Sequence, residues 1–130
     1  MKKLFVLMLT GLLLYSCNSY LGKKLRKKSA EDIKVEKIKD ACDCIEALDI
    51  IAADYLDVVG KNDKESINNM DDKKRQKFDK KAAPIMAKRE EVSSFCRKKF
   101  GISHANFTRG SACKLYKDLK EKSEIIEEKF

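Results

Sequence analysis

One stretch of the chain, residues 29 to 59, carries apolar side chains at a spacing that an α-helix gathers onto a single face. Ser29 is a suitable N-cap, Glu31 and Asp32 place negative charge in the first turn, and Gly60 follows the last apolar position. The pattern predicts one long amphipathic helix from Ser29 to Val59. Its apolar positions recur in alternating steps of three and four residues, at Ile38, Ala41, Ile45, Leu48, Ala52, Tyr55 and Val59.

Two further helical regions follow. Residues 68–72 and Pro84 are two places where the first of them can break, because Asn and Asp favour turns and proline lacks an amide hydrogen. Gly101 ends this region, a loop follows from Ile102 to Gly110, and Ser111 is expected to cap the last helix. The apolar faces are predicted at Phe78, Ala82, Ile85, Val92 and Phe95, and at Ala112, Leu115, Leu119, Ile126 and Phe130.

The composition agrees with a helical fold. The chain has 130 residues, a single Pro, five Gly and no Trp, which favours helices. Three amphipathic helices bury their apolar faces by packing together. We therefore expect residues 29–130 to form an all-α domain, a small antiparallel three-helix bundle. It would have four helices if the middle region is split near residues 68–72 or at Pro84.

The first 17 residues have the organisation of an export signal. Lys2 and Lys3 precede an apolar run from Leu4 to Tyr15 that is shorter than the roughly 20 residues needed to span a bilayer. Leu14-Tyr15-Ser16-Cys17 resembles the lipobox of bacterial lipoproteins, although Tyr15 departs from the usual small or aliphatic residue. The alternative is an ordinary secretory signal with an incidental cysteine.

The lipoprotein resemblance implies that residues 1–16 are a signal peptide, removed when Cys17 is lipidated and becomes the new N-terminus. Asn18 follows Cys17 in place of the Asp that retains such proteins in the inner membrane. The implied location is the bacterial cell envelope, as an outer-membrane lipoprotein facing the periplasm. The membrane would then be a partner through the lipid anchor, because two acyl chains suffice for stable attachment.

Residues 17–28 form a basic tether between the expected anchor and the helical domain. Its cations are Lys23, Lys24, Arg26, Lys27 and Lys28, whereas all 21 acidic residues lie further along the chain and nearly balance the remaining Lys and Arg. The tether either contacts anionic head groups or is a solvated, extended linker. Lys73 to Lys81 is also basic, but Asp71, Asp72 and Asp79 dilute it, so an exposed helix face is expected there and no nucleic acid is expected as a partner.

The four remaining cysteines are predicted to form disulfides, because export places them in an oxidising compartment. Cys42 and Cys44 are two residues apart on a helix, so their side chains point about 200° apart and cannot bond each other. We expect one to join Cys96 and the other Cys113. This pairing requires a break near residues 68–72 or at Pro84, since a straight helix would carry Cys96 past Cys44. The rival pairing joins Cys96 to Cys113 and leaves two free thiols.

No catalytic triad, glycine-rich phosphate loop, paired carboxylates or metal-binding helix motif is present in the sequence. We therefore expect a non-enzymatic structural or protein-interaction module with an unknown protein partner, no cofactor and no small-molecule substrate. An alternative is a thiol-based metal-binding or redox protein using Cys42, Cys44, Cys96 and Cys113 together with His104. A third candidate function is binding to a membrane surface or another polyanion through the basic tether.

Overall fold

The structure, a computed structural model, describes residues 28–130, and the regular secondary structure of this part is entirely helical, which confirms the expected all-α class. The expected signal peptide, Cys17 and the tether cations Lys23, Lys24, Arg26 and Lys27 lie outside the described residues. Four α-helices are present in the described part: α2 (Ala41–Val59), α3 (Lys64–Asn68), α4 (Asp72–Phe100) and α5 (Tyr116–Lys129). Three short 3-10 turns accompany them, η1 (Ala30–Asp32), η2 (Val35–Lys37) and η3 (Thr108–Gly110).

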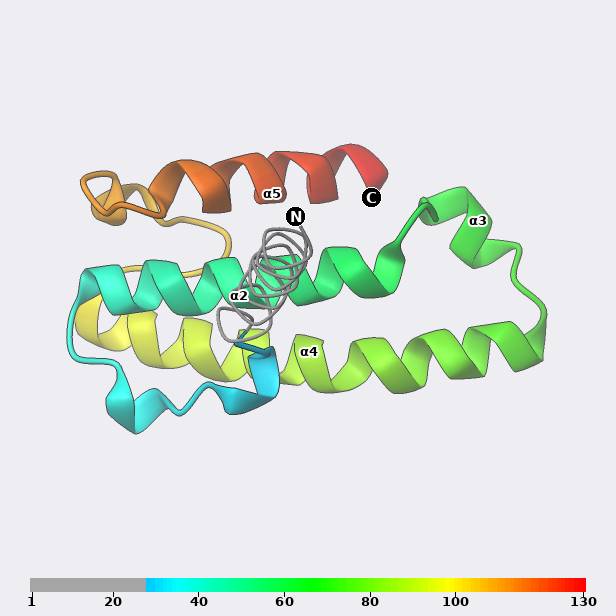
Figure 1. Cartoon of the computed structure of the whole chain (residues 1–130), viewed down its shortest axis with the longest axis horizontal. Helices are drawn as coiled ribbons and strands as arrows, with labels where there is room; N and C mark the ends of the chain where they lie inside the picture. Colours follow the sequence, from blue (N-terminus) through cyan, green and yellow to red (C-terminus); the bar gives the residue numbers. More distant parts are fainter. Residues whose placement is uncertain (1–27) are drawn as a thin grey trace, which may run out of the picture.

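The long helices lie side by side with α2 in the middle (Figure 1). Both α4 and α5 pack against α2, and the two outer helices hardly contact each other. Each long helix runs opposite to the one before it in the chain (Figure 1). Lys122 of α5 donates to Asp49 of α2 across 2.8 Å in a partly buried ion pair, which adds a polar link to this apolar contact. The central helix therefore carries most of the packing.

The first helix begins at Ala41, which corrects the predicted start at Ser29. Asp40 caps α2 by accepting from the Asp43 amide at 2.8 Å, and Asp43 in turn accepts from the Lys39 amide at 2.8 Å. These local bonds satisfy the helix end at this position. The preceding residues form η1 and η2 and fold back over α2 and α4, where the Ala30 amide donates to Asp54 at 2.6 Å.

The middle region is split at residues 69–71, one of the two expected places, where α3 ends and Asp71 caps α4. Pro84 does not split it: α4 continues through this residue for its full 29 residues. The proline side chain is exposed, so its ring displaces no core residue, although its missing amide hydrogen removes one helical bond. Gly101 ends α4 with a φ of 66°, a left-handed conformation suited to glycine.

The last helix starts at Tyr116 and not after the predicted cap, Ser111. The residues before it are held in turns. A Cβ on Gly110 would overlap the Ile45 side chain of α2, so the backbone approaches α2 more closely than any other residue type would allow. Cys113 is bonded to Cys42. The close approach of Gly110 and the bond of Cys113 hold residues 110–113 against α2, and the helix begins after them.

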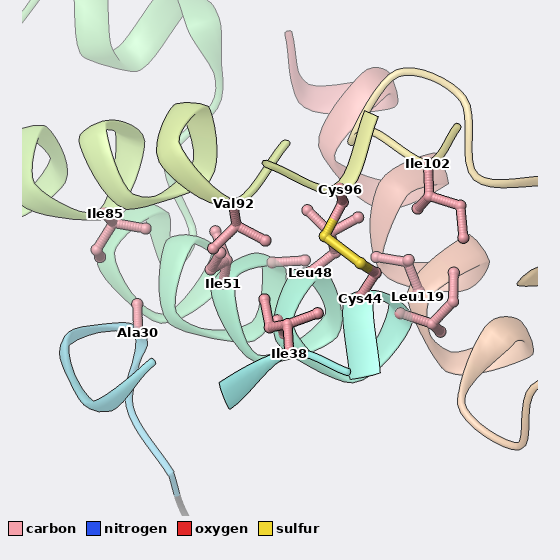
Figure 2. Close-up of a cluster of buried hydrophobic side chains, with 13 residues drawn as sticks. Ala30, Ile38, Cys44, Leu48, Ile51, Ile85, Val92, Cys96, Ile102 and Leu119 are labelled. Atoms are coloured by element: carbon pink, nitrogen blue, oxygen red, sulfur yellow. A yellow bond between two sulfur atoms is a disulfide. The ribbon is translucent and has the colours of Figure 1, made fainter. Parts of the chain in front are cut away.

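Residues 28–130 contain two disulfides, Cys42–Cys113 and Cys44–Cys96. As expected, one cysteine of the Cys42/Cys44 pair joins Cys96 and the other joins Cys113; the structure shows which is which. Cys44 and Cys96 lie within the buried core, where Leu48, Ile51 and Val92 surround the bridge (Figure 2). Ala30 and Ile38 of the N-terminal segment, together with Ile102 and Leu119 from the far part of the chain, belong to the same cluster. The two cysteines of the Cys44–Cys96 bridge are 52 residues apart in the sequence, and those of Cys42–Cys113 are 71 residues apart. Closing a loop of either size corresponds to about 4 kcal/mol of stabilisation.

The two bridges should differ in their sensitivity to reductant. Cys42 is exposed and Cys113 half-buried, whereas Cys44 and Cys96 are both 0% exposed. Because exchange requires a thiolate to reach a disulfide sulfur, mild reductant should open Cys42–Cys113 first. Thiol labelling followed by mass spectrometry should detect Cys42 and Cys113 first in the folded protein, and all four together in denaturant. Equal labelling of all four in the folded protein would contradict this order.

Candidate functional site

An apolar groove lies between α4 and α5, with α2 as its floor. Its volume is about 240 Å³. The floor is formed by Leu48, Ile51, Ala52 and Tyr55, which are spaced so that they share one face of α2. The groove exists because the two outer helices pack on α2 and hardly on each other. A concave apolar surface with a few polar groups is a candidate site for a ligand or partner.

The walls of the groove come from both outer helices and from the loop that follows α4. α4 contributes Ile85, Met86 and Arg89, α5 contributes Leu119, Ser123, Ile126 and Glu127, and the loop contributes His104 and Ala105. The rings of Tyr55 and Phe130 lie 5.9 Å apart, centroid to centroid. The lining is thus mostly aliphatic, with charge at two positions on opposite walls.

Arg89 is the polar group in this groove whose bonding is incomplete. Its Nε is buried and has no hydrogen-bond acceptor among the described residues. Its Nη2 lies 3.6 Å from an oxygen of Glu90, which is largely exposed. A buried donor without an acceptor costs roughly 1–3 kcal/mol. The Arg89 side chain as a whole is 28% exposed, so the accessible part of its guanidinium can pair with an acceptor on a ligand or partner.

Ser93 and His104 join the loop to α4 at the end of the groove. The Ser93 hydroxyl lies 2.9 Å from His104 Nδ1 and accepts from the His104 backbone amide at 3.1 Å. The distance resembles that of a nucleophile and its base, but Ser93 is only 1% exposed. The pair therefore fixes the loop on α4 and presents no accessible nucleophile.

Burial is the main cause that lowers the pKa of His104 below its ordinary value of 6.5. The positive charges of Arg89 and Arg97 act in the same direction, and Glu90 opposes them. Because the shift favours the neutral ring, His104 is uncharged at neutral pH. Arg89 and Glu127 are therefore the charged groups of the lining.

The structure separates the residues that the metal-binding alternative would have to bring together. All four cysteines are in disulfides, and His104 bonds to Ser93. Within residues 28–130 there is no group of three His, Cys, Asp or Glu side chains placed to hold a metal ion. No helix in this part of the chain combines the length and apolarity needed to cross a bilayer. Of the tether cations, Lys28 lies in the described part, where its Nζ is 3.6 Å from Glu46 in an exposed pair.

Sequence reasoning missed the groove and Arg89. Lys88 and Arg89 interrupt the apolar face of the second helical region, and this interruption was the available signal. Lys88, about 100° around the helix from Arg89, donates to the Ile33 carbonyl at 3.0 Å, whereas Arg89 lies on the groove wall. A charged residue at a position facing the core indicates a polar requirement there, because an unpaired charge is costly to bury.

Comparison with known proteins adds nothing to this description: no protein-family model, no curated protein and no solved structure matches the chain. The function must therefore be inferred from the chemistry and geometry of this chain alone.

The lowered pKa of His104 predicts a pH-dependent stability. The unfolded chain takes up a proton on this ring at a higher pH than the folded protein does, so stability falls as the pH drops below about 6.5. The melting temperature should therefore be lower at about pH 5 than at about pH 7.5. His104→Gln should reduce that difference, since His104 is the single histidine in the chain. An unchanged difference in the variant would assign the pH dependence to other groups.

Proposed function

We propose that this protein is a lipid-anchored protein of the bacterial cell envelope, held in the outer membrane and facing the periplasm. Its helical body is proposed to be a non-enzymatic protein-interaction module. The observation that carries this proposal is the apolar groove between α4 and α5, with the incompletely bonded Arg89 on its wall. The partner surface is proposed to be this groove.

The anchor is supported by the lipobox-like Leu14-Tyr15-Ser16-Cys17 at the end of a short apolar run. The disulfides Cys42–Cys113 and Cys44–Cys96 support export independently, since structural disulfides are typical of oxidising compartments and rare in the cytosol. The basic tether supports attachment close to anionic head groups. These three features agree on an envelope location.

The three long helices are proposed to act as a small antiparallel three-helix bundle that serves as a rigid scaffold. Cys44–Cys96 links α2 to α4, and Cys42–Cys113 links α2 to the turn that leads into α5. Both outer helices are thus covalently tied to the helix between them. Their spacing across the groove is held without direct packing between them, so the groove is formed before a partner arrives, which lowers the entropic cost of binding.

The occupant that fits best is an amphipathic helix of another protein. The floor runs from Leu48 to Tyr55, about two helical turns or roughly 11 Å. A partner helix with apolar residues at i, i+3 or i+4, and i+7 can place them in a groove of this kind. An acidic side chain on that helix would pair with Arg89, and a basic one with Glu127 on the opposite wall. The two charges would set the orientation of the partner.

The thiol-based alternative has less support. It requires reactive thiols at Cys42, Cys44, Cys96 and Cys113, and the structure uses all four in disulfides, one of them within the buried core. A structural role follows directly from that burial, because a core bridge cannot exchange without unfolding. The disulfides therefore favour a scaffold over redox or metal chemistry.

Replacement of Cys17 tests the anchor. In a bacterial host, the protein should lose its first 16 residues and gain a diacylglycerol on Cys17, and it should fractionate with membranes. Cys17→Ser should abolish the acylation and release the protein from the membrane fraction. Intact-mass measurement of both proteins checks the result. An unprocessed start at Met1, or a processed protein without acyl groups, would contradict the anchor.

Two neighbouring isoleucines test the groove. Ile126 lines it and is half-buried, whereas Ile125 is 43% exposed and does not line it. Ile126→Lys and Arg89→Gln should each weaken capture of the partner from envelope extracts by about tenfold or more, as loss of a central contact does. Ile125→Lys is the matched control and should capture normally. All three proteins should melt cooperatively, and crosslinks from the captured partner should map to the groove. Equal capture by all three would exclude the groove as the interface.

A further inference from the structure

The first half of α4 carries a row of lysines on one side. Lys73, Lys77, Lys80 and Lys81 are all exposed. At about 100° per residue they fall within an arc of about 100° around the helix axis. We call these four residues the lysine face. The linear sequence hides this arrangement, because acidic residues are interspersed among the lysines.

The acidic residues lie on the other side of the same helix. Asp72 and Asp79 are separated from the middle of the lysine face by more than about 120° around the axis. Asp79 accepts from Arg75 Nε at 3.2 Å, so its carboxylate is paired with an arginine on its own side of the helix and not with a lysine of the lysine face. The aspartates in this half of α4 therefore lie away from the lysine face, and the four lysines form no ion pair within the described part of the chain.

The lysine face lies beside the point where the chain enters from the expected anchor. Ser29, Lys80 and Lys81 line the same hollow on the surface, together with two acidic residues of neighbouring segments, Glu31 and Asp54. Asp54 accepts from the Ala30 amide. Further along α4, Lys88 extends from the same side and donates to the Ile33 carbonyl. The N-terminal segment therefore runs along this side of α4. Any membrane to which Cys17 is attached lies within the length of residues 17–28, at most about 40 Å when extended.

We propose that the lysine face docks the folded body onto the anionic phospholipid head groups of the membrane that holds the anchor. The inference rests on the proposed lipid anchor. Each lysine that reaches an anionic surface raises partitioning about fivefold, and a short tether keeps the face at a high local concentration near that surface. Four lysines that bind an anionic surface weakly and reversibly on their own therefore hold the body on that surface for longer once the chain is anchored.

Docking in this way orients the groove. Met86 and Arg89, two of the α4 residues that line the groove, lie more than about 120° around the helix axis from the middle of the lysine face. Ile85 lies between the two sides and lines both the groove and the hollow beside Lys80 and Lys81. With the lysine face on the membrane, the groove stays clear of the head groups and open to a partner. The lysine face and the groove therefore have separate roles on one helix.

Vesicle binding tests the proposal with the chain from Asn18 onward, which lacks Cys17 and its acyl chains. The probe is vesicles of phosphatidylethanolamine with and without phosphatidylglycerol. The triple variant Lys73→Gln, Lys77→Gln and Lys80→Gln should bind anionic vesicles about 100-fold more weakly than the unmodified chain. The matched control, Lys114→Gln, Lys117→Gln and Lys120→Gln, loses the same charge elsewhere and should bind within a fewfold of it. Equal loss in both variants would overturn the proposal, as would equal binding to vesicles with and without phosphatidylglycerol.

A second measurement uses the full lipidated protein. A water-soluble amine-reactive reagent should label Lys73, Lys77 and Lys80 less when the protein is on anionic vesicles than when it is in detergent. Lys114, Lys117 and Lys120 should label equally in both. Mass spectrometry of the peptides gives both ratios in one sample. Unchanged labelling of the lysine face, in a protein whose acylated Cys17 is confirmed by mass, would refute the docking and leave the anchor intact.

Discussion

The disulfide between Cys44 and Cys96 is the constraint on which the rest of the structure depends. It joins the first turn of α2 to the last turn of α4 within the buried core, with both residues fully buried and side chains of the N-terminal segment, α2, α4 and the last loop in the same cluster (Figure 2). A domain of about 100 residues has a modest core, so a covalent link within that core supplies a large share of its stability. The second bridge, Cys42–Cys113, holds the segment leading into α5 on the same central helix.

This arrangement explains why the groove is present. In a bundle that depends on packing alone, α4 and α5 would close on each other to bury their apolar faces. Here each is tied to α2, and they hardly touch each other. The apolar surface left between them, with Arg89 on one wall and Glu127 on the other, is suited to a partner helix. On the same α4, the lysine face is turned away from the groove, so attachment and recognition use different sides of one helix.

The sequence predicted what depends on helical periodicity and missed what depends on contacts between distant segments. The angle between Cys42 and Cys44 on a helix excluded a bond between them and indicated that they join different segments, but it left open which of them joins Cys96. The break before Asp71 followed from turn-forming residues. The predicted start of the first helix at Ser29 was wrong. Ile38 fits the apolar period of the helix, but its backbone is extended, and the helix begins only after Asp40, whose side chain caps it. The groove could not be predicted, because it depends on how closely α4 approaches α5. The lysine face could have been predicted from the sequence by placing the charged residues of 73–81 around a helix. The sequence analysis compared them only along the chain.

The most direct test of this account is the disulfide map of the protein isolated from the cell envelope. Proteolysis without reduction, followed by mass spectrometry, identifies which cysteine peptides are joined; Asp43 between Cys42 and Cys44 allows cleavage that separates the two bridges. The account predicts peptides joined through Cys44 and Cys96 and through Cys42 and Cys113, with no free thiol among the four. A bridge between Cys96 and Cys113, with free thiols at Cys42 and Cys44, would contradict it, because α4 and α5 would then no longer be held on α2.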